Sequence, residues 1–137
     1  MGDKVMFTAV ADRGGYYGPF TSDRTLVFNT AITNIGGNYD ATSGIFTAPA
    51  QGYYFFTFSY HASKQHKTGL NLIKNHDLIV RAFNDKIGAS TIIDNAGNAA
   101  TLQLEAGDKV FVQLPAECHV YAADSVTTFS GFLIKGA

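Results

Sequence analysis

The residues of this chain best suited to chemistry are bases, and they gather in one stretch. Residues 41–76 contain no Asp or Glu. The same stretch carries six basic side chains, namely Lys64, Lys67, Lys74, His61, His66 and His76. Such groups bind carboxylates, sulfates and phosphates, and the histidines gain charge as the pH falls below about 6.5. The stretch predicts either solvated loops or an anion-binding patch, for which the candidate residues are Lys64, His66, Lys67 and Lys74.

No arrangement of residues predicts catalysis. The sequence has no nucleophile motif of the Gly-x-Ser-x-Gly type, no phosphate-binding glycine-rich loop and no pair of histidines at helical spacing. The acidic residues mostly stand singly beside a base, as in Asp12-Arg13 and Asp108-Lys109. We therefore expect a binding module and not an enzyme, with no cofactor.

Composition excludes several other classes. The 137 residues fit one domain, 46% of them are hydrophobic, and the net charge is −1. Neither disorder nor a general attraction to nucleic acid is expected from these values. No run approaches the roughly 18 apolar residues that span a membrane, so membrane insertion is not expected. The single Cys118 cannot form an internal disulfide and is expected to be a buried, inert thiol.

Short alternating segments between turn residues predict an all-β domain. The clearest strand begins at Gly52, and every second residue from Tyr54 to Tyr60 is aromatic, so one face of the strand belongs in a core. Tyr53 and Phe55 make the first half of the opposite face apolar as well, and that half needs a second layer or a second subunit. About ten strands without a helix predict a two-sheet jelly-roll sandwich. Other strands are expected at 5–11, 25–28, 45–48, 69–73, 78–83, 99–104, 110–114 and 127–134, with loops at 34–38, 63–68 and 88–98 and a turn at 74–77.

Tyr16 and Tyr17 lie between glycines in a predicted turn. Two aromatic side chains exposed in a loop are unfavourable unless they cover a neighbouring strand or a subunit. The pair therefore serves either packing or recognition, and the sequence leaves both readings open.

The aromatic spacing also carries a resemblance to a known family. Residues 28–58 follow the order Phe-x5-Asn-x4-Tyr-x6-Phe-x5-Gly-x-Tyr-x-Phe-x-Phe. This order resembles, position for position, the signature of the globular head of complement component C1q and its relatives, and residues 107–110 and 128–134 look like further blocks of that family. We interpret the signature residues as core positions: Phe28, Asn34, Tyr39, Phe46, Gly52, Tyr54, Phe56, Phe58, Gly107, Asp108, Phe129, Gly131 and Phe132.

The resemblance implies a ten-stranded jelly roll shared with the tumour necrosis factor superfamily, a tight homotrimer, secretion and non-catalytic binding. Residues 4–137 would form the C1q-type globular domain, and residues 1–3 a linker or cloning remnant. Short secreted C1q-like and cerebellin-like proteins look most similar. Two functions stay open: a recognition head that binds anionic or microbial surfaces multivalently in innate immunity, and an extracellular signalling ligand, cerebellin-like or cytokine-like, that clusters a protein receptor.

Some relatives hold calcium through carboxylates in the loop before the strand expected at 99–104. In this chain that loop offers Asp94 and Asn95. Calcium takes six or more oxygen ligands, so one carboxylate per subunit is a poor donor set. Asp94 is the sole calcium candidate.

Overall fold

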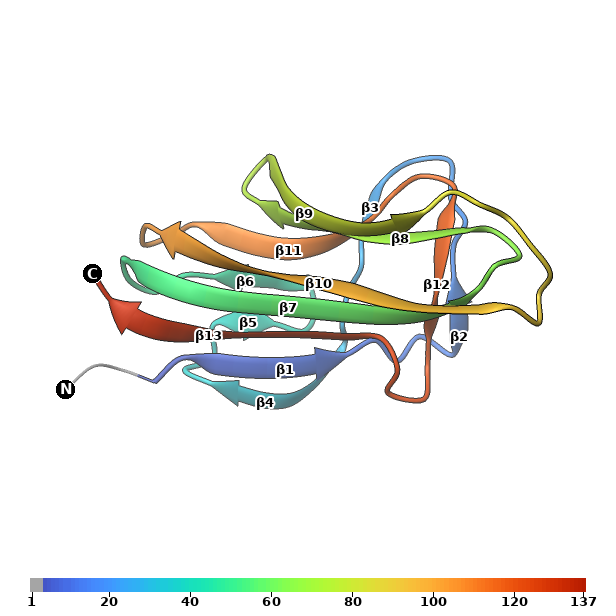
Figure 1. The fold of residues 1–137 in the computed structure, drawn as a ribbon. Coiled ribbons are helices and arrows are strands. Elements are labelled where there is room, and N and C mark those ends of the chain that lie inside the picture. Colours follow the sequence, from blue (N-terminus) through green and yellow to red (C-terminus); the bar gives the residue numbers. More distant parts are fainter. Residues whose placement is uncertain (1–3) are drawn as a thin grey trace.

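The computed structural model describes residues 4–137 as two packed β-sheets, and this part of the chain forms no helix that could span a membrane (Figure 1). The predicted linker at residues 1–3 lies outside the described residues. The five-stranded sheet has the order β10 (Ile93–Leu104), β7 (Gly52–Ser63), β13 (Thr128–Gly136), β1 (Met6–Val10) and β4 (Thr30–Ile35). The eight-stranded sheet has the order β2 (Gly15–Tyr17), β12 (Cys118–Ala122), β8 (Lys67–Lys74), β11 (Lys109–Leu114), β6 (Ile45–Thr47) and β5 (Tyr39–Asp40), with β3 (Arg24–Thr25) beside β11 and β9 (Asp77–Asn84) beside β8.

The core lies between the two sheets and consists largely of aromatic rings. The alternate aromatics from Tyr54 to Tyr60 on β7 are buried, as their spacing predicted. Phe7 on β1 stacks on Tyr39 of the other sheet with ring centroids 4.7 Å apart, and it meets Phe129 edge to face at 4.9 Å. The Tyr39 hydroxyl donates a 2.7 Å hydrogen bond to the Phe28 carbonyl, so its polar end is satisfied inside the core.

Most signature residues occupy the core positions assigned to them. The buried ones are Phe28, Tyr39, Phe46, Gly52, Tyr54, Phe56, Phe58, Phe129 and Gly131. Three others serve turns instead. The Asn34 amide donates to the Tyr39 carbonyl at 2.8 Å, Gly107 takes a φ of 92°, and the Asp108 carboxylate accepts from the Glu105 backbone at 2.8 Å. The core interpretation is therefore wrong for Asn34, Gly107 and Asp108.

The interpretation of Phe132 as a core residue is also wrong. Its side chain is 43% exposed on the outer face of β13. Neighbours along a strand point to opposite faces, and here Gly131 faces the core, where a side chain would collide with Phe56 and Phe7. The apolar run from Phe132 to Ile134 lacks the polar alternation that would have indicated which residue points inward.

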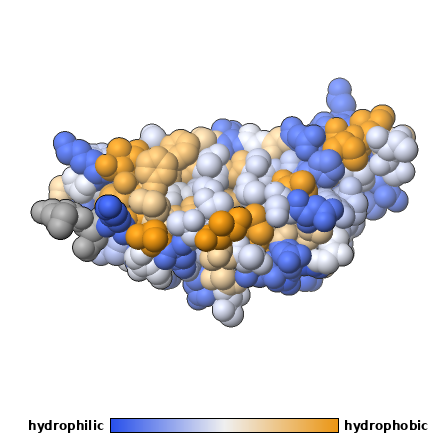
Figure 2. Space-filling model, turned by 90° about the horizontal axis from the view of Figure 1, so that it is seen from below, coloured by the Kyte–Doolittle hydropathy of each residue, from blue (hydrophilic) through white to orange (hydrophobic). Residues whose placement is uncertain are grey.

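Phe132 belongs to an apolar belt across the outer face of the five-stranded sheet. The strand registers place Ile35 opposite Met6, Met6 opposite Phe132, and Phe132 opposite Phe55. The rings of Phe55 and Phe132 lie 5.4 Å apart. We call these four residues the apolar belt. Figure 2, which views the molecule from the side of β1 and β4, shows several separate groups of hydrophobic side chains on that side.

Several predicted boundaries differ from the structure. β10 begins at Ile93, so half of the loop expected at 88–98 is strand, because twelve consecutive residues pair with β7. The loop expected at 63–68 is reduced to residues 64–66, between β7 and β8. The turn expected at 74–77 is confirmed, and Asn75 takes the left-handed conformation with a φ of 55°.

The end of the sandwich opposite the C-terminus has a covering that the sequence did not predict. There β2 and β12 form an antiparallel ribbon that runs across the end of the molecule (Figure 1). β12 also pairs in parallel with β8 through Cys118 and His119. The strand expected at 25–28 is reduced to Arg24–Thr25.

The buried aromatic side chains of β7 should carry much of the stability. Phe56→Ala or Phe58→Ala should each lower the free energy of unfolding by about 3–5 kcal/mol, because each leaves a cavity among rings from both sheets. Phe20→Ala, which removes a partly exposed ring, should cost less. Urea unfolding of the three variants measures the difference, and losses below about 1 kcal/mol at Phe56 and Phe58 would contradict this account of the core.

Candidate functional site

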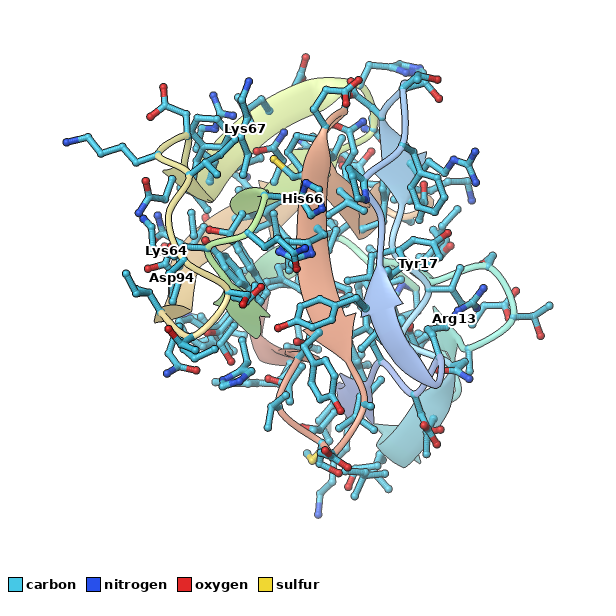
Figure 3. All side chains as sticks on the ribbon, turned by 90° about the vertical axis from the view of Figure 1, so that its right-hand side faces the viewer. Arg13, Tyr17, Lys64, His66, Lys67 and Asp94 are labelled. Carbon is cyan, nitrogen blue, oxygen red and sulfur yellow. The ribbon has the colours of Figure 1, made fainter. Side chains whose placement is uncertain are left out.

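Three of the four predicted basic residues, Lys64, His66 and Lys67, lie at the end of the molecule that β2 and β12 cover. The turn between β7 and β8 carries Lys64 and His66, and Lys67 begins β8. Figure 3 shows these residues on one side of this end and Tyr17 and Arg13 on the other. We call this surface the end face.

Lys64 does not present a free charge on the end face. Its Nζ atom lies 3.8 Å from Asp94 Oδ2, and the two side chains are only 14% and 23% exposed. The same carboxylate oxygen accepts hydrogen bonds from Thr68 Oγ1 at 3.0 Å and Asn84 Nδ2 at 3.1 Å. Lys64 is therefore a poor member of the predicted anion-binding patch, and Lys67 is the lysine next to this turn that forms no ion pair within the described residues.

Asp94 does not fit a calcium site on a single chain. Its neighbours are a lysine, a hydroxyl and an amide nitrogen, none of which adds a carboxylate. Among residues 4–137, no three side chains of the His, Cys, Asp and Glu types are grouped to hold a metal ion. The donor set falls below the six or more oxygens that calcium takes. Calcium binding stays an expectation from the family resemblance.

Tyr16 is held in place by packing. Its ring stacks on His119 with centroids 4.5 Å apart and planes 15° apart, and its hydroxyl accepts a hydrogen bond from the Ser63 backbone at 2.9 Å. The buried His119 lies with Nε2 2.8 Å from the Ser63 carbonyl oxygen, and His66 approaches its ring edge to face at 4.9 Å. Tyr16 thus joins β2, β12 and the end of β7.

Tyr17 belongs to a row of alternating cationic and aromatic side chains. The Arg13 guanidinium lies 5.3 Å from the centre of the Tyr17 ring, Tyr17 meets Phe20 edge to face at 4.9 Å, and the Arg24 guanidinium lies 3.8 Å above Phe20. Neither guanidinium forms an ion pair with any residue that the structure describes. Rows of this kind can bind anions and sugar rings. Sequence analysis missed Arg13, Phe20 and Arg24 because no repeat or motif links them.

Lys74 and Cys118 take no part in the end face. Lys74 ends β8, at the opposite end from Lys67, and its Nζ lies 3.9 Å from Asp108 Oδ2. Cys118 is buried and free, as predicted, and burial raises the pKa of its thiol. A buried thiol with a raised pKa is a poor nucleophile, which agrees with a packing role.

The amino-acid sequence of this chain is similar to those of known proteins. The model of the C1q domain family matches residues 6–134. Caprin-2 of Danio rerio is 36% identical over 135 residues, which cover 96% of this chain and 14% of that protein. A polypeptide of the complement C1q subcomponent of Homo sapiens is 31% identical over 117 residues, covering 85% of this chain and 46% of that protein. The chain thus spans less than half the length of either relative.

Solved structures share the fold. The globular domain of the zebrafish complement 1qA protein superposes with a TM-score of 0.77 at 18% identity, covering 98% of this chain and 100% of that one. Eiger TNF from S. frugiperda gives 0.73 at 11% identity, covering 99% of this chain and 96% of that one. These similarities confirm the jelly-roll class. The strand count is thirteen in residues 4–137, close to the predicted ten, and the additional strands are short.

The stability of the domain should fall in mild acid because of His119. Burial lowers the pKa of His119 below its usual 6.5, and the nearby His66 lowers it further, against the opposing hydrogen bond to Ser63. As the pH falls through 6.5, the unfolded chain takes up this proton before the folded chain does. The free energy of unfolding therefore decreases below pH 6.5 and stops decreasing below the folded pKa.

This prediction is checked by urea unfolding at about pH 7.5 and about pH 5.5. The wild type should be less stable at the lower pH, and His119→Gln should reduce the difference. His76→Gln, in the exposed turn between β8 and β9, is the matched control and should keep the wild-type difference. An unchanged difference in His119→Gln would assign the acid sensitivity to other groups.

Proposed function

This chain belongs to the C1q domain family, and from that premise we propose that it is a secreted, homotrimeric recognition head that binds partner molecules or surfaces multivalently, in innate immunity. The family consists of binding and signalling proteins, which supports a non-catalytic role. The observation that carries the proposal is the apolar belt.

The apolar belt is exposed to solvent on an isolated chain, and we propose that a second copy of the chain packs against it. Met6, Ile35 and Phe132 are between 39% and 47% exposed, and Tyr53 adds another exposed aromatic ring on the same sheet. Exposed apolar area costs about 25 cal/mol per Å² relative to buried area, so burying a row that crosses four strands favours association.

The distribution of the remaining exposed hydrophobic residues supports a ring. Leu78 and Phe83 on β9 of the eight-stranded sheet are 52% and 42% exposed, and Ile93 at the start of β10 is 41% exposed. β10 is the edge strand of the five-stranded sheet away from β4, so these residues lie at that edge of the sandwich. Two different apolar surfaces on one chain fit a head-to-tail contact, in which the belt of one subunit covers this edge of the next. Such contacts close into cyclic oligomers, of which a trimer is the form that the family implies.

A cyclic trimer repeats the end face three times. Each copy contributes Lys67, His66 and the row from Arg13 to Arg24. Single exposed charges bind weakly, but three linked sites that engage one surface gain avidity without new contacts. Anionic glycans and microbial surfaces are ligands of suitable chemistry.

The second candidate function is a cerebellin-like or cytokine-like signalling ligand that clusters a receptor. One observation favours it. The contact between Lys64 and Asp94 removes one free cation per subunit from the end face, so the attraction for polyanions is weaker than the sequence alone predicted. A receptor ligand would bind one cell type saturably and would show little affinity for heparin.

The purified chain should sediment as a trimer of 14.7 kDa subunits at micromolar concentration. Phe132→Glu should shift it to monomers, because a charge buried in the belt contact would lack a partner. Val126→Glu adds the same charge at an exposed hydrophobic position outside the belt and should remain trimeric. A monomeric wild type, or a trimeric Phe132→Glu variant, would refute the proposed contact.

Heparin retention tests the recognition role. Lys67→Ala should elute at lower salt than the wild type, and Lys64→Ala should change retention less because Lys64 is paired with Asp94. Retention should increase from about pH 7.5 to about pH 5.5 as histidines protonate, and it should weaken in salt. Lys4→Ala removes an exposed lysine that lies outside the end face and is the control. Equal retention of all four proteins at both pH values would favour the receptor-ligand function.

A further inference from the structure

The eight-stranded sheet carries a depression that neither the belt nor the end face includes. It lies between β5, β6 and the start of β11 and has a volume of about 350 Å³. This volume is at the lower end of the range for small-molecule sites. The apolar belt lies on the outer face of the other sheet.

Two opposite charges line this depression without pairing. Asp40 lies on one side and Lys109 on the other, and neither takes part in an ion pair within the described part of the chain. The Thr42 backbone donates to Asp40 Oδ1 at 2.8 Å, and this hydrogen bond is the largest cause of the lowered pKa of Asp40. Lys109 Nζ lies 3.4 Å from Thr47 Oγ1. The Asp40 carboxylate is thus held in its charged form, and Lys109 has no acidic partner within residues 4–137.

The walls of the depression are fixed by backbone hydrogen bonds. Gly44 donates to the Asp40 carbonyl at 2.8 Å and takes a φ of 80°, at a position where any side chain would meet the Leu26 carbonyl. On the other side, the Thr47 backbone donates to the Asn38 carbonyl at 3.0 Å. The loop that carries Asp40 is therefore already ordered, and a ligand would not have to order it.

We propose that this depression binds a small zwitterion that joins a primary ammonium group to a phosphate group. The ammonium group would donate hydrogen bonds to Asp40, and the phosphate would bind Lys109. None of the nine lining residues is aromatic, which disfavours a quaternary ammonium, because such groups are recognised by aromatic rings.

A phosphate suits this site better than a carboxylate. Lysine is a point charge, whereas planar carboxylates are matched by the fork of arginine. The hydroxyls of Ser43 and Thr47 and the amide of Asn38 line the same depression and add neutral hydrogen-bonding groups for further oxygens. A second depression of about 630 Å³ is lined by His76 and Phe111 and shares Lys109 with the first. It has room for a further substituent on the phosphate group.

Calorimetric titration of the purified chain with O-phosphoethanolamine tests the site. This probe should bind more tightly than phosphocholine, which lacks ammonium hydrogens, and more tightly than ethanolamine or inorganic phosphate alone. Vesicles of phosphatidylcholine with and without phosphatidylethanolamine distinguish the source of the group. Binding to the mixed vesicles indicates a membrane ligand, and binding only to the soluble probe indicates a soluble ligand, and both uphold the site.

Asp40→Asn and Lys109→Gln should each weaken binding of O-phosphoethanolamine about tenfold or more, since each removes a charged partner. Asn keeps an oxygen that can accept from Thr42, so the turn should survive, and the urea unfolding midpoint verifies this. Asp85→Asn and Lys86→Gln remove exposed charges of the same kinds elsewhere and should bind as the wild type does. Equal affinity for phosphocholine, or wild-type affinity in both site variants, would overturn the proposal. Heparin retention does not depend on these residues, so the two proposals fail separately.

Discussion

The interlocking of aromatic rings from both sheets is the interaction on which the rest of the structure depends. Phe7 of β1 contacts Tyr39 of β5, Phe46 of β6 and Phe129 of β13, so rings from both sheets converge on one side chain. Buried aromatic pairs add to the transfer energy of their area, and the chain has no disulfide to supplement them. These contacts join the two sheets through their side chains.

The same constraint explains why the candidate recognition surfaces lie at the periphery. Charged side chains are excluded from a core of this kind, and every ion pair that the described residues form lies near a strand end. At the end face, Tyr16 and His119 both bind backbone atoms of Ser63, and Lys64 pairs with the Asp94 side chain. These contacts give a chemically varied surface a fixed shape, which is what multivalent recognition requires.

The outer faces of the two sheets differ in a way that suits assembly. The five-stranded sheet exposes the apolar belt, whereas the eight-stranded sheet exposes a depression with one acid and one base. If copies associate through the belt, their polar surfaces stay outside. One jelly-roll domain can thus combine a surface for self-association with separate surfaces for ligands. Substitutions can test each surface without altering the other.

The sequence determined what depends on local periodicity. The alternation from Tyr54 to Tyr60 identified the central strand and its buried face, the all-β class followed from short segments without helical spacing, and Asn75 marked a turn. These features are set by strand geometry and by the conformations that single residues tolerate, so neighbours along the chain suffice to predict them.

Tertiary structure alone decided which residues meet across the chain. The outward position of Phe132 follows from its register with Phe55, which a continuous apolar run cannot indicate. Asp94 neutralises Lys64 because β10 pairs with β7 from Ile93 onward. The small, polar residues at the start of β10 resembled a loop in the sequence. Asp40 and Lys109 share a depression although they lie far apart in the sequence, because β6 pairs with both β5 and β11. Charges pair or stay free according to distances that only the folded chain defines.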